Sequence, residues 1–510
     1  MNLAKELSGK LWDMANTLRG TIDASEFKNY ILGMLCYKYL SEETFKTVKN
    51  VLFMEDSTNE EVFKEWEENE DWCKEQLLLA QGCFIDKKYL FDKLIEKINN
   101  DTFSIEDLAN GIDSFNKSFI GFKSEESFKD MFEDLDLTSS KLGKTVSAKN
   151  KIISELMIKI YNLTSTYGGE EDVLGTAYMI LISNFASSAG KKGGEFYTPA
   201  SMSKLLTEIA TVGLESVRTC LDPTCGSGSL LLNVKQKYND CSLYGQELTS
   251  STYNLARMNM ILHGIKYDKF NLKNMNTIEE MIPTDFDKFD VCVANPPYSA
   301  KWHPENVSNT DPRYASYGKF APASKADLAF VQHILHLLKN GDSRAAVLLP
   351  HGVLFRGSSE ENIRKYIIEK LNKLDAVIGL PSNCFYGTNI PVCLLVLKND
   401  REENKDNICF IDASKEFVSG KSMNYITDEH IDKIVKTYME RKEVDKYCHI
   451  ASMDEIIEND YNLNIPRYVD TFEEEEPIDI PTVKANIVKH MEESKAIDAE
   501  LEDYFKQLGI

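Results

Sequence analysis

Short apolar runs alternate with helical patterns through the second half of the sequence, and this alternation limits the folds open to the chain. The runs are TCLDP, SLYGQEL, FDVCVANP, AAVLLP, DAVIGLP and VCLLVL, and helical segments such as LAFVQHILHLLKN lie between them. Parallel strands need long crossover connections, which are usually helices, so the pattern is typical of parallel strands with helices on both faces of the sheet. We therefore predict a doubly wound α/β domain, which we place at residues 151–415.

Helical periodicity dominates both ends of the chain. Leu3, Leu7 and Leu11 recur at helical spacing, and we expect a helical N-terminal domain over residues 1–150. We expect a mostly helical C-terminal region over residues 416–510. Its last stretch carries a stripe of apolar residues at helical or near-helical spacing, namely Ile487, Met491, Ile497, Leu501 and Leu508. Such a stripe has to be buried, either on the same chain or on a partner helix, and both remain open.

Length and charge narrow the classes of function. At 510 residues the chain exceeds the roughly 250–300 residues at which single cores stop growing, so we expect two or three domains. Its 81 acidic residues outnumber its 58 Lys and Arg residues, which gives a formal net charge of -23. Because phosphate neutralisation dominates nucleic-acid affinity, this chain alone is not expected to grip DNA over a wide surface. Any contact with DNA should be local or shared with a partner.

Targeting signals and metal-binding cysteine patterns are missing from the sequence. No apolar stretch approaches the roughly 20 residues that span a bilayer, and MNLAKELSGK lacks the apolar core of a signal peptide, so we expect a cytoplasmic protein. The cysteines are odd in number, at 11, and form no CxxC pair. We interpret them as reduced core residues and predict no metal site.

A glycine-containing turn, LDPTCGSGSLL at residues 221–231, follows one apolar run and opens into a helical pattern. Gly226 and Gly228 would let the backbone approach a ligand closely. The next strand ends in YGQEL, where Glu247 stands in the position of a carboxylate that binds a ribose diol. Many doubly wound domains use such a turn for dinucleotides or for no ligand, and Glu247 also fits a helix-start carboxylate. The turn alone therefore does not select a function.

The run that ends at residue 294 is followed by Asn295, Pro296, Pro297 and Tyr298. This NPPY sequence suits the transfer of an electrophilic methyl group to a poorly nucleophilic amine, such as the exocyclic amine of adenine. The side-chain oxygen of Asn295 and the carbonyl of Pro296 can accept its two N–H bonds and stabilise the positive charge that grows on nitrogen. No metal or strong general base is required. The alternative, a rigid turn after a strand, is disfavoured by the glycine turn upstream.

Aromatic residues are expected to receive the base. Tyr298 offers a ring on which a base turned out of the duplex can stack. A second ring is expected from the loop LPSNCFYGTNIPV, where we favour Phe385 over Tyr386 as the opposite side of a sandwich. Core packing is the alternative role for Phe385 and Tyr386.

The order of three motifs resembles one group of enzymes. GEFYTP precedes DPTCGSG, which precedes NPPY, and this order is similar to that of the gamma group of N6-adenine DNA methyltransferases. The resemblance implies a Rossmann-like class I methyltransferase domain, S-adenosyl-L-methionine as cofactor, and an adenine flipped out of duplex DNA. It implies that GEFYTP closes over the cofactor, that residues 227–229 contact its methionine part, and that Glu247 holds its ribose. The implied cofactor-site residues are Glu195, Phe196, Tyr197, Thr198, Pro199, Ala200, Asp222, Thr224, Gly226, Ser227, Gly228, Ser229, Glu247, Asn276 and Asn295.

Nearly the full length resembles the modification (M) subunit of a type I restriction-modification system. The similar segments include DASEFKNYILGMLCYKYLS, DVLGTAYMILISNFASSAGKKGGEFYTP, ADLAFVQHIL and NLNIPRYV. The resemblance implies that a separate specificity (S) subunit reads the DNA sequence and that two M subunits and one S subunit form the methyltransferase. It further implies that a restriction (R) subunit adds cleavage and that the C-terminal region docks on the S subunit.

An acidic chain can act on DNA if the S subunit makes most of the contacts with the duplex. The S subunit would hold most of the duplex, and a local basic rim would contact the rest. Our candidates for that rim are Lys301, Arg313, Lys319, Lys325 and Arg356. Ordinary solvated charge is the alternative interpretation of each.

Three other functions remain open. Protein-glutamine methyltransferases also carry NPPY, but they are typically short and lack GEFYTP. N4-cytosine enzymes need the same two acceptors, so the motif does not separate them from adenine enzymes. A scaffold subunit with a vestigial pocket predicts decay at Asn295, Tyr298 or the glycine turn, and the sequence shows none. The DNA recognition sequence is not encoded in these motifs.

Overall fold

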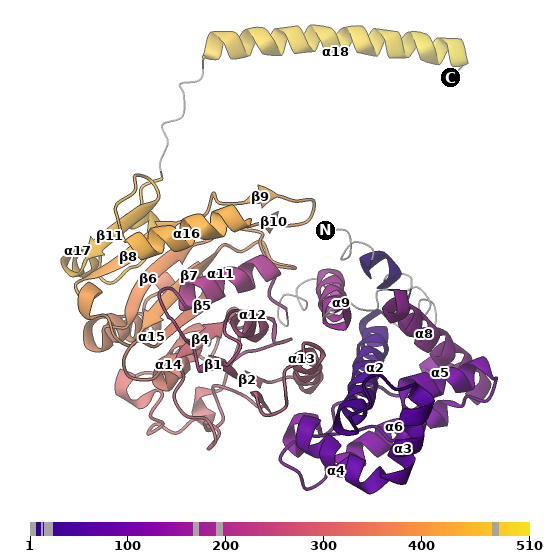
Figure 1. Cartoon of the computed structure of the whole chain (residues 1–510). Helices are drawn as coiled ribbons and strands as arrows, with labels where there is room; N and C mark the ends of the chain where they lie inside the picture. Colours follow the sequence, from indigo (N-terminus) through magenta and orange to yellow (C-terminus); the bar gives the residue numbers. More distant parts are fainter. Residues whose placement is uncertain are drawn as a thin grey trace. The chain divides into compact units, whose positions relative to one another are not determined.

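The computed structural model describes residues 7–11, 14, 24–166, 173–189, 197–471 and 479–509. Residues up to Val469 form one compact unit, and the residues from Asp470 onward form another. Each unit is described here by itself (Figure 1). No described helix is both long and apolar enough to cross a membrane.

A nine-stranded sheet forms the centre of the first unit within the described residues. Its strands are β1 (Thr219–Asp222), β2 (Ser242–Glu247), β3 (Phe270–Asn274), β4 (Val291–Ala294), β5 (Arg344–Pro350), β6 (Leu374–Gly379), β7 (Val392–Lys398), β8 (Asn407–Asp412) and β11 (Cys448–Ser452). Their order is β11-β8-β6-β7-β5-β4-β1-β2-β3. Because β1 lies between β2 and β4, the strand order reverses there, as in a doubly wound sheet. The predicted α/β fold class is confirmed.

Strand direction follows from the connections between strands. The strands from β1 to β5 run parallel to one another where they pair. β7 instead runs antiparallel to both β5 and β6. No helix lies in the segment 380–391 between β6 and β7, so the chain returns directly beside the strand it has left. The prediction that VCLLVL is a parallel strand is therefore wrong.

Alternate residues of the strands pack on opposite faces of the sheet. In β4, Val291 and Val293 belong to one hydrophobic cluster, whereas Cys292 and Ala294 belong to the other. Burial on both faces explains why the strands appear in the sequence as unbroken apolar runs. One face packs on α11 (Ala200–Ala210), α12 (Ser229–Lys237), α13 (Ser250–Leu262) and α16 (Asp428–Glu440), and the other on α14 (Asp327–Leu337), α15 (Ser359–Lys365) and α17 (Met453–Glu458). All 11 cysteines are buried and free, as predicted.

The N-terminal part of the first unit is helical. Its described helices are α2 (Ala24–Val51), α3 (Asn59–Glu68), α4 (Glu70–Gln81), α5 (Phe91–Asn99), α6 (Ile105–Ser118), α7 (Glu125–Phe128), α8 (Val146–Thr166) and α9 (Val173–Ala189). Arg257 of α13 joins these helices to the sheet: its Nη1 donates to the backbone carbonyls of Glu126, Ser127 and Lys129 at 3.3, 3.3 and 2.7 Å. The predicted boundary at residue 150 falls within α8, which continues to Thr166.

The sheet continues beyond residue 415, the predicted end of the α/β domain. β11 pairs antiparallel with β8 as an edge strand, and a two-stranded ribbon of β9 (Val418–Ser419) and β10 (Asn424–Tyr425) also lies in this region. The compact unit ends only at Val469. The second unit contains α18 (Ile480–Leu508), which has no buried residues.

Candidate active site

A cavity of about 230 Å³ opens at the carboxyl end of the parallel strands. In doubly wound folds, ligands bind at this edge, next to the point where the strand order reverses. The cavity is lined by residues that end or follow four strands, β1 to β4. They are Pro223, Thr224, Gln246, Glu247, Leu248, Thr249, Asn276, Thr277, Ile278, Glu279, Pro297, Ala300, Lys301 and Trp302, with Phe330 from α14.

The glycine turn between β1 and α12 brings a backbone N–H group to Glu247, which lines the cavity. Gly226 and Gly228 have φ of +53° and +80°, a conformation that favours glycine. A Cβ on Gly228 would stand 2.4 Å from the Cε atom of Met260. The Gly226 N–H donates to Glu247 Oε2 at 3.2 Å, and the Thr249 N–H donates to Oε1 at 2.8 Å. Glu247 is thus fixed at the end of β2, and burial raises its pKa.

Two polar side chains beside this turn are buried without a hydrogen-bond partner among the described residues at one of their atoms. Asp222 Oδ1 accepts from the Thr224 N–H at 3.0 Å, but Asp222 Oδ2 has no partner. Ser227 Oγ has none either, although the Ser227 carbonyl accepts from Asn259 Nδ2 at 2.8 Å. Burial raises the pKa of Asp222 to about 7. Since unpaired buried polar groups are costly, these two atoms call for a ligand that bonds to them.

The NPPY residues follow β4 directly, and Asn295 is held at both ends of its amide. Its Nδ2 donates to Thr198 Oγ1 at 3.1 Å, and its Oδ1 accepts from the Tyr298 hydroxyl at 2.9 Å. Burial raises the pKa of the Tyr298 phenol, so the group remains a donor. Thr198 belongs to the GEFYTP segment, so two motifs far apart in sequence meet at one side chain.

The aromatic side chains near Tyr298 differ in geometry from the predicted sandwich. The Phe385 ring lies 6.2 Å from the Tyr298 ring at an interplanar angle of 85°, which is an edge-to-face contact. Phe385 is buried, at 4% exposure. Tyr386 packs elsewhere, because its hydroxyl bonds to Ser183 Oγ at 3.0 Å and its ring lies 6.0 Å from that of Tyr197. Tyr298 and Phe385 are neighbours, but their rings are not parallel.

The structure adds a side chain that the sequence did not single out, Asp327. Its Oδ1 accepts from the N–H of Ser299 at 2.7 Å, just after the NPPY residues, where Ser299 has φ of +52°. Asp327 is buried at the start of α14 and pairs with Arg356, which also bonds to Glu360 at 2.9 Å. An aspartate that begins a helix is common, so its position alone carries no functional signal.

Ser229 is buried at the start of α12 and does not line the cavity. The remaining predicted cofactor-site residues fall into three groups. Glu195 and Phe196 lie outside the described residues. Tyr197, Thr198 and Pro199 are buried, and Ala200 begins α11 with its side chain exposed. Thr224, Glu247 and Asn276 line the cavity. Apolar lining residues such as Leu248, Ile278 and Phe330 were missed, because single apolar residues carry no motif.

The five residues of the predicted basic rim differ in exposure and in their bonds. Lys301 and Lys319 are exposed, Lys325 is half-buried, and Lys301 also lines the cavity. Arg356 is bonded to the buried carboxylates of Asp327 and Glu360. Arg313 is 2% exposed and bonded within the protein, so the prediction that it contacts DNA is wrong.

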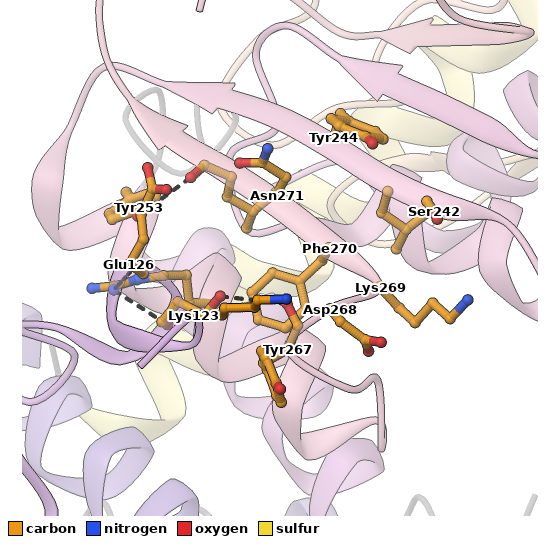
Figure 2. A pocket seen from close by; sticks show the side chains of 14 residues that line it. Lys123, Glu126, Ser242, Tyr244, Tyr253, Tyr267, Asp268, Lys269, Phe270 and Asn271 are labelled. Carbon is orange, nitrogen blue, oxygen red and sulfur yellow. Dashed lines mark hydrogen bonds between the residues drawn. The ribbon is translucent and has the colours of Figure 1, made fainter. Parts of the chain in front are cut away.

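Another cavity, of about 220 Å³, lies between the N-terminal helices and the edge of the sheet, and its lining contains none of the NPPY residues (Figure 2). Its lining includes Lys123, Glu126, Asp268 and Lys269. These charges are of both signs and belong to none of the motifs. We therefore place the candidate active site at the carboxyl end of β1 to β4.

Comparison with known proteins places the chain in a family. The profile of the N-6 DNA methylase family matches residues 169–477, and that of the HsdM N-terminal domain matches residues 7–160. The methylase subunit of the type I restriction enzyme MpnII of Mycoplasma pneumoniae is 37% identical, over 98% of this chain and 96% of that protein. The HindI methylase subunit of Haemophilus influenzae is 32% identical, over 68% of this chain and 80% of that protein.

Solved structures give the same result. The crystal structure of a type I restriction-modification methyltransferase subunit from Streptococcus thermophilus covers 92% of this chain and 100% of its own, with a TM-score of 0.84 and 43% identity. A structure of a type I restriction-modification system shares the fold at a TM-score of 0.62 and 19% identity.

The fold and site therefore define an N-6 DNA methylase, an adenine-specific DNA methyltransferase. More particularly, the chain belongs to the family of type I restriction enzyme methylase subunits, the M subunits of restriction-modification systems. The resemblance seen in the three ordered motifs is confirmed at this level.

Proposed function

We propose that this chain binds S-adenosyl-L-methionine in the 230 Å³ cleft and transfers its methyl group to N6 of an adenine flipped out of duplex DNA. The observation that carries the proposal is the meeting of the two parts at one edge of the sheet. Pro297 of NPPY lines the same cavity as Glu247 and Thr224. A methyl donor held there would lie beside the residues that are to receive the amine.

The cleft and two buried side chains in the adjoining glycine turn, Asp222 and Ser227, suit the cofactor. Bound S-adenosyl-L-methionine supplies an electrophilic methyl group. The unpaired Asp222 Oδ2 suits its ammonium group, and the unpaired Ser227 Oγ suits its carboxylate, because the hydroxyl can donate. Glu247, fixed by the Gly226 and Thr249 N–H groups, suits the ribose hydroxyls. Leu248 and Phe330 supply apolar surface.

The NPPY residues suit the acceptor amine. Asn295 Oδ1 has two lone pairs, so one remains for an adenine N–H while the Tyr298 hydroxyl occupies the other. The Pro296 carbonyl would accept the second N–H. Both acceptors strengthen as positive charge grows on nitrogen, which stabilises the transition state more than the neutral amine. Stacking on Tyr298 offsets the stacking that the base loses on extrusion.

We further propose that the chain works in a complex with an S subunit, a second M subunit and, for cleavage, an R subunit, in the cytoplasm where its DNA substrate lies. The S subunit would supply sequence specificity. The N-terminal helices would provide the helical part, the sheet and its flanking helices, which continue past the predicted boundary at 415 to Val469, the catalytic part, and α18 the docking part. The exposed apolar residues of α18 support the docking role, since Ile487, Met491 and Leu508 are 53%, 59% and 73% exposed. Lys301, Lys319 and Lys325 remain candidates for local DNA contact.

Methylation mapping in the host tests this function. We expect N6-methyladenine at one recognition sequence to disappear when the gene is deleted and to return with the wild-type gene. An Asn295→Ala gene should not restore it, although the protein still accumulates. Unchanged methylation after deletion, or full restoration by Asn295→Ala, would contradict the proposal.

A further inference from the structure

Arg313 lies in the segment after NPPY, and each of its five guanidinium N–H bonds has an acceptor or partner nearby. Nε–H points to the Asp311 carboxylate at 3.0 Å. Nη2 donates to the Glu280 carbonyl and to Asp311 Oδ2, both at 2.8 Å. Nη1 donates to the Thr277 carbonyl at 2.7 Å and lies 3.2 Å from Nδ1 of His333. A side chain so fully used within the protein has no N–H left for DNA.

The carbonyl acceptors belong to one wall of the cleft. Thr277, Ile278 and Glu279 line the cavity, and Arg313 binds the carbonyls of Thr277 and Glu280 from behind. The Tyr314 hydroxyl donates to the Ile278 carbonyl at 2.9 Å. Two consecutive side chains therefore hold three carbonyls of a segment that has no strand or helix to fix it.

A second branch leads from Arg313 to the part of the cleft lining that β2 contributes. Because Arg313 is only a donor, His333 Nδ1 has to accept, and His333 Nε2–H donates to Gln246 Oε1 at 2.9 Å. Burial, together with the charge of Arg313, lowers the pKa of His333 well below its usual value, so the ring stays neutral. Gln246 directly precedes Glu247 in β2. One guanidinium thus reaches both the 277–280 wall and the strand that carries Glu247.

We infer that Arg313 is a positioning residue for the cofactor: together with Tyr314 it holds the 277–280 wall at the distance from Glu247 that S-adenosyl-L-methionine requires. The inference rests on the proposed function, because it assumes that the cofactor binds in this cleft. Arg313 does not line the cavity and acts through the backbone carbonyls that it binds. It also ties the segment after NPPY to the cofactor wall, so that loosening one loosens the other.

The chain offers a matched control in Arg344. Like Arg313, Arg344 is buried, follows an aspartate two residues earlier, and bonds to it, with Nη2 donating to Asp342 Oδ1 at 2.8 Å. It also donates to a backbone carbonyl, that of Val212. Arg344 begins β5, which runs parallel to β4, so it lies at the amino end of the sheet, away from the cleft. Arg344→Lys therefore removes a similarly bonded guanidinium group without changing the contacts of the 277–280 wall.

Calorimetric titration of the full chain with S-adenosyl-L-methionine tests the inference. We expect Arg313→Lys to weaken binding about tenfold and Tyr314→Phe about threefold, whereas Arg344→Lys binds as wild type even if its Tm falls. Methyl transfer at saturating cofactor should change less than affinity. If Arg313→Lys does not fold, Tyr314→Phe decides.

Two failures are distinguishable in the same titration. If the wild type binds, Glu247→Ala weakens binding, and the folded Arg313→Lys or Tyr314→Phe binds like wild type, the positioning role is overturned and the proposed function stands. Equal weakening by Arg344→Lys would also overturn it, since general destabilisation would then explain the loss. If Glu247→Ala binds as tightly as wild type, the cofactor site itself is wrong.

Discussion

Two aspartates at opposite ends of β1 have opposite environments. Asp222 is the last residue of β1, whereas Asp290 precedes β4 and bonds to the amino end of β1. At the amino end, the Asp290 carboxylate accepts from the N–H groups of Arg218 and Thr219, both at 2.9 Å, and from Lys339 Nζ at 2.6 Å. At the carboxyl end, Asp222 accepts from the Thr224 N–H through Oδ1 at 3.0 Å, and its Oδ2 has no partner in the part of the chain that the structure describes. The hydrogen bonds of the aspartate carboxylate are therefore complete at the amino end and incomplete at the carboxyl end.

This difference separates a residue for folding from a residue for binding. Partial burial raises the pKa of Asp290, but its bonds with Lys339, Thr219 and Arg218 lower it more, so the net shift is downward. Burial without such partners raises the pKa of Asp222 to about 7. Asp290 therefore stabilises the folded chain as an anion, whereas an ionised Asp222 is costly until a cation binds it. Substitutions at the two positions should have opposite consequences.

Of the two aspartate substitutions, Asp222→Asn is expected to have the larger effect on cofactor affinity. We predict that S-adenosyl-L-methionine affinity falls about thirtyfold near pH 8, because the amide retains the shape but loses the charge that pairs with the ammonium group. The thermal midpoint of the protein without cofactor should stay the same or rise, since a buried unpaired carboxyl is removed. Calorimetric titration and thermal unfolding measure the two quantities. A lower midpoint with unchanged affinity would reverse the roles assigned to the two aspartates.

For Asp290→Ala we expect the converse result. Losing the acceptor of two backbone N–H groups and the partner of Lys339 should lower the free energy of unfolding by about 2 kcal/mol. Cofactor affinity of the folded variant should remain within about twofold of wild type. Denaturant unfolding and the same titration provide the measurements. A tenfold loss of affinity in a folded variant would show that the two ends of the sheet are not independent.

The pH dependence of cofactor binding should follow Asp222. Its folded pKa is raised, so the carboxyl is largely protonated below about pH 7 and must lose a proton to pair with the cofactor cation. Affinity should therefore rise as pH increases through 7, by up to about tenfold per pH unit on the acid side. Asp222→Asn should lack this contribution, so the difference between the two pH profiles is the quantity to measure. Parallel profiles would argue against Asp222 as the titrating group.

The smallest effect is expected for Tyr298→Phe. The variant keeps the stacking surface and loses only the hydroxyl that donates to Asn295 Oδ1, so methyl transfer should slow by about threefold to tenfold. Tyr298→Ala, which removes the ring, should slow it more, because base–aromatic stacking is worth about 1–3 kcal/mol. Rates on duplex DNA with the reconstituted complex compare the two. Equal losses in both variants would assign the role to the hydroxyl instead of the ring.

Sequence reasoning identified the elements whose signal is local. Unbroken apolar runs gave the strands that are buried on both faces, and the spacing of NPPY and Glu247 after two of them placed both at one edge of the sheet. The direction of β7 was missed because it depends on the helix-free connection before it, and β3 and β11 were missed because polar side chains interrupt their apolar runs. β8 was missed although its run of Ile408 to Ile411 is apolar throughout.

The contacts of individual side chains could not be predicted from local sequence patterns. In the sequence, Arg313 cannot be distinguished from an arginine on the surface. Only the fold brings the carbonyls of Thr277 and Glu280 to its guanidinium group. The bond between Thr198 and Asn295 joins residues 97 positions apart, so no local pattern announces it. The perpendicular contact of Phe385 with Tyr298 likewise depends on how two distant loops pack.

The most direct test of the account is a single-turnover assay with the complex of this chain and its S subunit, methyl-labelled cofactor and duplex DNA, comparing wild type with Asn295→Ala. We predict label on adenine N6 with the wild type, and a rate about 100- to 1000-fold lower with Asn295→Ala while its cofactor affinity is unchanged. Transfer at the wild-type rate by Asn295→Ala, or label on cytosine N4, would contradict the account.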